Sequence, residues 1–184
     1  MEIEKITFCN GCHTCFSLCP KQSIKMVANS EGFLYPQIDE SLCVKCGLCE
    51  KKCPVLNPLQ KEDEQTLAYA VINNNEKIRL ESSSGGVFTA LAENVIRQNG
   101  IVFGAKFDSD FNVIHGYTDS IEGLADFRGS KYVQSTIGKS FKDCKRFLDE
   151  DRTVLFSGTP CSSTISFMSS DITVIISAFL YAIF

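Results

Sequence analysis

Two short cysteine runs with one shared spacing constrain this chain more than any other feature of its sequence. Cys9, Cys12, Cys15 and Cys19 form the first run, and Cys43, Cys46, Cys49 and Cys53 form the second. Both runs follow the pattern C-x2-C-x2-C-x3-C-P, with Pro20 and Pro54 in the last position. These runs hold eight of the ten cysteines, so the first third of the chain must be organised around sulfur.

This spacing is that of bacterial ferredoxins with two [4Fe-4S] clusters. Three thiolates at two-residue intervals wrap one cluster within a tight loop, and the fourth begins a helical turn that points away. Each cluster is therefore expected to take three ligands from one run and the fourth ligand from the other. The expected ligand sets are Cys9, Cys12, Cys15 and Cys53 for one cluster, and Cys43, Cys46, Cys49 and Cys19 for the other.

Structural zinc is the alternative reading of the cysteines, because zinc sites also use paired C-x2-C units. Zinc does not account for a third cysteine at the same interval or for the following Cys-Pro, and both occur twice. Gly11 and Gly47 are expected to let backbone N–H groups approach the cluster sulfurs. His13 lies inside the first loop, where it could tune a cluster or carry a proton, but a solvent-exposed loop residue is expected.

Charge and composition point to a cytoplasmic protein. Residues 1–5 include acidic side chains and no apolar run, unlike a secretory signal, and free thiolates fit a reducing compartment. A net charge of -4 gives no reason to expect a nucleic acid or an anionic membrane as a partner. The apolar residues 172–184 number thirteen, short of the roughly 20 that cross a bilayer, so no membrane span is expected.

The composition changes after a polar linker at residues 57–66. The pattern predicts strands at 67–72, 101–107, 112–117 and 153–156, and helices at 87–97 and 141–148. Strands that alternate with helices favour an α/β or α+β second domain. The first helix is expected to present one apolar face made of Val87, Phe88, Leu91, Ala92, Val95 and Ile96.

Two single residues and one short segment of this second part have simple expected roles. Cys144 falls on the apolar face of the later helix and is expected in the core. His115 alternates with Val113 and is expected to be a satisfied strand residue. Ser83, Ser84, Gly85 and Gly86 precede the helix at 87, where exposed N–H groups and the helix dipole attract a phosphate. Serine and glycine before a helix are also ordinary caps, so this segment alone leaves both readings open.

Four sequence blocks follow one another in a recognisable order, at residues 83–88, 102–105, 127–135 and 156–161. Together with the cysteine runs they resemble the coenzyme F-420 hydrogenase/dehydrogenase beta-subunit family, in its form with a fused two-cluster ferredoxin domain. The resemblance covers about residues 5 to 161. It implies an iron–sulfur flavoprotein that binds FAD and passes electrons between clusters and a hydride acceptor such as the deazaflavin coenzyme F-420.

The resemblance also implies site residues in the second part of the chain. Lys131 is expected near a phosphate or the flavin N1 region, with a surface lysine as the alternative. Cys161 is expected to be a redox-active, catalytic cysteine or a ligand of an extra cluster, with a buried thiol at a strand end as the alternative. The expected FAD-binding residues are Ser83, Ser84, Gly85, Gly86, Lys131, Tyr132, Gln134 and Ser135.

The family pattern stops after Cys161, and residues 162–184 form an atypical, largely apolar tail. The sequence therefore predicts a truncated or frame-shifted product. Its expected fold is α+β, with a two-cluster ferredoxin-like domain at 1–56, a linker at 57–66, an incomplete α/β flavin-binding-type domain at 67–161 and the tail at 162–184.

The expected function is that of an oxidoreductase subunit that relays electrons through two [4Fe-4S] clusters to or from a flavin. Its expected partners are a redox protein or subunit and a small-molecule hydride acceptor. The alternative is a ferredoxin-like electron carrier fused to a non-functional second domain. Flavin in the purified protein separates the two readings.

Overall fold

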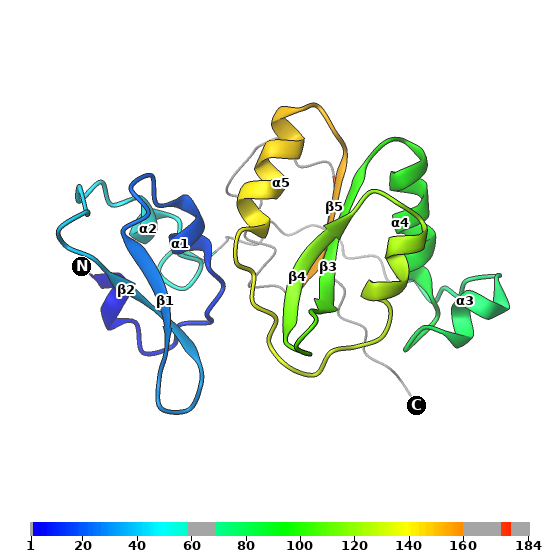
Figure 1. Cartoon of the computed structure of the whole chain (residues 1–184), viewed down its shortest axis with the longest axis horizontal. Coiled ribbons are helices and arrows are strands. Elements are labelled where there is room, and N and C mark those ends of the chain that lie inside the picture. Colours follow the sequence, from blue (N-terminus) through cyan, green and yellow to red (C-terminus); the bar gives the residue numbers. More distant parts are fainter. Residues whose placement is uncertain (1, 59–68, 160–173, 178–184) are drawn as a thin grey trace. The chain divides into compact units, whose positions relative to one another are not determined.

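A computed structural model describes residues 2–58, 69–159 and 174–177 of the chain (Figure 1). These residues fall into two compact units, unit 1 up to residue 58 and unit 2 from residue 69 onward. Helices and strands are mixed in both, so the chain is α+β. Within the described ranges, no helix has the length and apolar character needed to cross a membrane.

Unit 1 is built around a β-hairpin flanked by short helices. Its elements are η1 (Glu2–Lys5), α1 (Thr14–Leu18), β1 (Ile24–Ala28), β2 (Leu34–Ile38) and α2 (Leu48–Lys51). Strands β1 and β2 are antiparallel, with Ile24 opposite Ile38 and Ala28 opposite Leu34. The Asn29 side-chain oxygen closes the turn by accepting hydrogen bonds from the backbone N–H groups of Glu31 and Phe33. The sequence analysis did not predict this hairpin.

The core of unit 1 is small, and half of its buried residues are cysteines. Its buried members are Ile3, Ile24 and Ile38 together with Cys15, Cys49 and Cys53. Partly buried residues such as Met26 pack against them. Domains of this size bury little apolar surface and commonly need a metal or other cross-link for stability. The composition of the core therefore indicates that the thiols contribute to the stability of unit 1.

Unit 2 contains a four-stranded mixed sheet in the order β4-β3-β5-β6. The strands are β3 (Ile101–Phe107), β4 (Val113–Thr118), β5 (Val154–Gly158) and β6 (Val174–Ser177). β3 pairs antiparallel with β4 and parallel with β5. The strands predicted at 101–107, 112–117 and 153–156 are therefore confirmed, with shifts of one or two residues at some ends.

One segment of the expected tail contributes to this sheet. β6 pairs in parallel with β5, so that Leu155 lies opposite Val174 and Gly158 opposite Ser177. These four residues extend the sheet, and in this respect that part of the tail belongs to unit 2.

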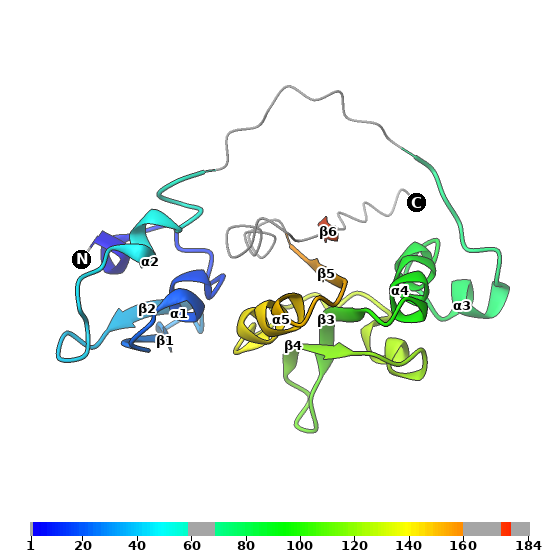
Figure 2. The same ribbon diagram turned by 90° about the horizontal axis from the view of Figure 1, so that it is seen from above.

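The helices α4 (Val87–Arg97) and α5 (Ser140–Asp149) cover opposite faces of the sheet, as Figures 1 and 2 show. Side chains on a strand alternate between faces. Val102 and Leu155 pack in one cluster with Ala92 and Val95 of α4. Phe103 and Phe156 point the other way and stack on each other at 5.6 Å between ring centroids. Unit 2 is thus a three-layer α/β/α arrangement.

Some local expectations for unit 2 were wrong. Residues 69–72 form no strand, and the sequence analysis missed α3 (Glu76–Leu80) and the 3-10 helix η2 (Glu122–Phe127). On α4, Thr89 is buried while Leu91 is 42% exposed. The inward face is therefore centred on Thr89, Ala92 and Val95, because the layer of β3 and η2 lies on that side.

We expect Phe156→Ala to destabilise unit 2 by about 3–5 kcal/mol, because a fully buried ring is lost and a cavity remains. Phe156 has no exposed surface and contacts Phe103, Phe141 and His115. The matched control is Phe111→Ala, whose ring is 82% exposed and whose loss should change stability by about 0.5 kcal/mol or less. Urea unfolding monitored by far-UV circular dichroism measures both. Equal stability of the two variants would contradict this packing.

Candidate functional site

The two cysteine loops of unit 1 follow the same backbone path. Gly11 and Lys45 occupy equivalent positions and have φ angles of +60° and +53°. His13 and Gly47 are also equivalent, with φ angles of +60° and +71°. In both loops a backbone N–H donates to the first sulfur at 3.4 Å, from Gly11 to Cys9 Sγ and from Lys45 to Cys43 Sγ. The expected N–H role is thus seen at Gly11, and in the second loop Lys45 fills it.

Each loop leads directly into a short helix that carries the fourth cysteine away from it. His13 caps α1 and Gly47 caps α2, both in the left-handed conformation. Cys19 and Cys53 follow these helices, and each precedes a proline, which disfavours continuation of the helix. The fourth sulfur of each run is therefore free to serve a different site from the first three.

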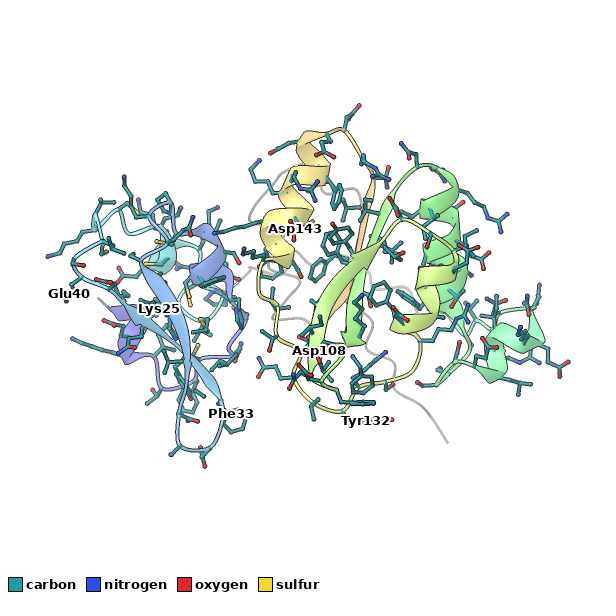
Figure 3. All side chains as sticks on the ribbon, viewed as in Figure 1. Lys25, Phe33, Glu40, Asp108, Tyr132 and Asp143 are labelled. Carbon is teal, nitrogen blue, oxygen red and sulfur yellow. The ribbon has the colours of Figure 1, made fainter. Side chains whose placement is uncertain are left out.

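Two cavities in unit 1 collect the eight run cysteines in groups of four. The first cavity is lined by Cys9, Cys12, Cys15 and Cys53. The second cavity is lined by Cys43, Cys46, Cys49 and Cys19. Each set combines three cysteines of one run with the last cysteine of the other. This is the grouping that the sequence analysis expected, while ligation by these thiols stays a prediction. Figure 3 shows the sulfur atoms within unit 1.

The β1–β2 hairpin forms a wall that the two cavities share. Ile24 and Ile38 are paired across the hairpin and line the second cavity. Met26 and Pro36, the pair two residues further along, line the first cavity. The two cavities therefore lie against successive parts of the same hairpin.

Burial makes the thiolate forms costly in the absence of a metal. It raises the pKa of Cys15 to about 12 and raises the pKa of Cys9 and of Cys49. At Cys19 burial acts in the same direction, but the Ser23 hydroxyl and backbone N–H at 3.2 and 3.3 Å outweigh it and lower the pKa. Iron ions supply the positive charge that makes buried thiolates stable, as with other metal ligands.

The arrangement of the thiols has the form of a cluster site. Among the residues that the structure describes, no three His, Cys, Asp or Glu side chains converge closely enough to hold one metal ion. The four cysteines of each set instead surround a cavity. A [4Fe-4S] cluster is held by four thiolates, and this donor set fits it.

His13 is buried in the first cavity, and the expectation that it lies at the surface was wrong. It is only 4% exposed, and burial lowers its pKa. Its ring lines the cavity and meets the edge of Phe16 at 5.8 Å between centroids. Neither ring nitrogen has a hydrogen-bond partner within the described structure. Alignment of the two runs, which places His13 opposite Gly47, is the sequence signal that marks this position as unusual.

Comparison with known protein families agrees with this geometry. Residues 8–57 match the family described as the 4Fe-4S dicluster domain. The chain therefore carries a ferredoxin-type domain that binds [4Fe-4S] clusters, and an electron-transfer role follows from it. A search of curated proteins found no match to the chain.

The expected flavin residues of unit 2 gather near one edge of its sheet. β3, β5 and β6 run in the same direction, so their carboxyl ends lie at the same edge. In Figure 1 the amino ends of α4 and α5 also face this edge, and Figure 3 shows Tyr132 at the same end of the unit as Asp108, which follows β3. In open α/β sheets, ligands bind outside the carboxyl ends of the strands.

The two segments that were expected to form the flavin site meet directly. The backbone N–H of Ser130 donates to Ser83 Oγ at 2.6 Å. Arg128, which the sequence analysis did not single out, lies between them and α4. Its guanidinium pairs with Glu81 at 2.5 Å and donates to Thr89 Oγ1 in the first turn of α4 at 3.3 Å.

The glycines at the start of α4 are required by the fold itself. A Cβ at Gly85 would lie 2.5 Å from the carbonyl oxygen of Val71. Gly86 has a φ of +73°, a left-handed conformation that favours glycine. The fold therefore explains both glycines without a bound phosphate. Evidence for phosphate binding must come from the neighbouring hydrogen-bond donors.

Other expected flavin residues are held by internal contacts. Lys131 Nζ donates to the carbonyl oxygens of Asp126 and Arg128, at 2.9 Å each, and burial lowers its pKa. Ser135 Oγ lies 2.7 Å from His115 Nδ1, and His115 Nε2 lies 2.9 Å from the Ser157 carbonyl oxygen. Because a carbonyl only accepts, Nε2 carries the proton, and the Ser135 hydroxyl donates to Nδ1 of the neutral ring.

The remaining residues lie on the surface, in the core or beyond the described ranges. Ser84 is half-buried, and Tyr132 and Gln134 are exposed. Cys144 is fully buried as predicted, and burial raises its pKa to about 12. His115 is buried and hydrogen-bonded as predicted. Cys161 lies outside the described residues.

We expect Cys53→Ser to damage the cluster of the first loop and to spare the cluster of its own run. The cluster content should fall from about eight to about four iron atoms per chain. The surviving signal, recorded by electron paramagnetic resonance after reduction, should match the signal left by Cys12→Ser. A match to the signal left by Cys46→Ser would show that the fourth cysteine does not cross over.

Proposed function

We propose that this chain is an iron–sulfur electron-transfer subunit whose two [4Fe-4S] clusters are held by crossed ligand sets. The observation that carries the proposal is the composition of the two cavities, each lined by three cysteines of one run and one of the other. Cys9, Cys12, Cys15 and Cys53 would hold one cluster, and Cys43, Cys46, Cys49 and Cys19 the other. The clusters supply one-electron redox chemistry when bound.

The protein residues of unit 1 set the environment in which electrons reside. Ile24 and Ile38 line the second cavity and Met26 lines the first, so each set of cysteines has apolar side chains beside it. The N–H groups of Gly11 and Lys45 donate to cysteine sulfurs and stabilise added negative charge. Unit 1 thus offers two positions for an electron along one hairpin.

We further propose that unit 2 binds a flavin and exchanges electrons with a small-molecule hydride acceptor. A flavin accepts one or two electrons, so it connects one-electron clusters with hydride chemistry. The support is the resemblance to the coenzyme F-420 hydrogenase/dehydrogenase beta-subunit family, together with the meeting of Ser83 and Ser130 near the carboxyl ends of the parallel strands of the sheet.

The donors at this edge fit the phosphate end of FAD. The start of α4 presents backbone N–H groups, and Arg128 and Lys131 lie beside the segments that join there. Arg128 is paired with Glu81, and Lys131 donates to two backbone carbonyl oxygens. Tyr132 is 94% exposed at the same edge and offers an aromatic face for the flavin ring.

Anaerobic purification of the whole chain, with iron, sulfide and flavin quantified, tests both levels of the proposal. About eight iron and about eight sulfide per chain support two clusters. Flavin near one equivalent supports the second level. A full iron content without flavin, even after incubation with FAD, identifies the chain as an electron carrier alone. Zinc in place of iron would contradict the whole proposal.

We expect Tyr132→Ala to lower the FAD content per chain without changing the iron content or the stability of unit 2. The ring is almost fully exposed, so its removal leaves the fold intact. Tyr69→Ala is the matched control, because that ring is 78% exposed and lies outside the flavin segments. Absorbance of FAD released by denaturation gives the measurement. The same loss in both variants, or no loss in either, would contradict the placement of the flavin.

A further inference from the structure

His13 is the one histidine among the residues that line the two cavities, and it belongs to the first cysteine loop. The loops around the cavities have the same backbone path, and position 13 in the first loop corresponds to position 47 in the second. His13 lines the first cavity, and Gly47 lines the second. The imidazole therefore has no counterpart in the second cavity.

Histidine at position 13 lowers the stability of the fold relative to glycine. Its backbone is left-handed, with a φ of +60°, which costs a non-glycine residue about 1 kcal/mol or more. The glycine at the equivalent position avoids that cost. Burial of both ring nitrogens without a hydrogen bond adds a further penalty. Since the fold accepts glycine at the same point of the second loop, the backbone alone does not require a histidine.

We infer that His13 donates an N–H hydrogen bond to the sulfur of the cluster held by Cys9, Cys12, Cys15 and Cys53 and thereby raises the reduction potential of that cluster. The inference rests on the proposed ligand sets. The imidazole carries at least one N–H in every protonation state that it adopts, so the argument is independent of its titration.

The direction of the effect follows from electrostatics. Reduction adds one negative charge to the cluster, and an N–H donor stabilises the more negative state more strongly. The buried setting strengthens the interaction, because little water screens it. The backbone donors from Gly11 and Lys45 are matched at 3.4 Å in the two loops. The Ser23 hydroxyl and backbone N–H lie at 3.2 and 3.3 Å from Cys19 Sγ in the second set. The contribution of His13 is therefore measured as the shift of its own cluster when the donor is removed, and not as the difference between the two clusters.

His13→Phe is the primary test, because it keeps a ring and the left-handed backbone but removes the donor. In a potentiometric titration followed by electron paramagnetic resonance, one of the two one-electron steps should move to lower potential. We expect the ratio of reduced to oxidised cluster at a fixed potential to fall about tenfold, which is about 59 mV. His13→Asn retains an amide donor and tolerates this backbone, and it should recover part of the shift.

Two further variants keep the result interpretable. His13→Gly adopts the left-handed backbone without strain and should shift the same step to lower potential. It serves as the test if His13→Phe does not assemble its clusters. Gly47→His is the reciprocal change, and a Cβ there meets nothing within 4 Å. It should raise the potential of the other step. Phe33→Leu, at the hairpin turn shown in Figure 3 and outside both cavities, should leave both steps unchanged.

The outcomes separate this inference from the proposed function. Iron well below about eight atoms per chain in the unmodified protein would refute the cluster proposal itself. Full iron content with unchanged potentials in His13→Phe and His13→Gly would overturn the role of His13 alone. Equal shifts of both steps, or a similar shift in Phe33→Leu, would overturn it too, since the hydrogen bond would then not be specific to one cluster.

Discussion

The exchange of the fourth cysteine between the two runs is the constraint on which unit 1 depends. Neither run completes a set of four by itself, because Cys19 lies at the cavity of the second loop and Cys53 at that of the first. Beyond the sulfurs, the buried core consists of three isoleucines. The free energy of cluster binding is therefore also folding free energy, as in small metal-dependent domains. The crossed arrangement makes both halves of the unit form together.

The two units use burial for different ends. In unit 1 it raises the pKa of Cys9 and Cys15, so that thiolates persist there only beside a compensating cation. In unit 2 it surrounds aromatic rings and a neutral histidine, with His115 stacked on Phe156 at 5.0 Å. Unit 1 buries groups that become charged when they bind a metal. Unit 2 buries apolar rings that support a sheet, and ligands of such sheets bind at the carboxyl ends of the strands.

The sequence predicted the parts of the fold that spacing and periodicity encode. The C-x2-C-x2-C-x3-C spacing predicted which four cysteines line each cavity, and the apolar periodicity of residues 87–97 predicted α4. The hairpin was missed because β1 and β2 are five residues long and their burial depends on the sulfurs packed against them. The burial of His13 was missed because a loop position carries no periodicity, and a single backbone angle decides where its side chain points. The apolar residues 69–72 read as a strand, yet they lie beside the Gly85 turn with exposed side chains.

The repeated loop separates the path of the backbone from the side chains that line it. At one pair of equivalent positions the first run has glycine (Gly11, against Lys45), and at the other pair the second run has it (Gly47, against His13). All four residues adopt the left-handed conformation, so the loop keeps its path with either kind of residue. The surroundings of one set of cysteines can therefore change at these positions while the backbone that carries the thiols stays the same.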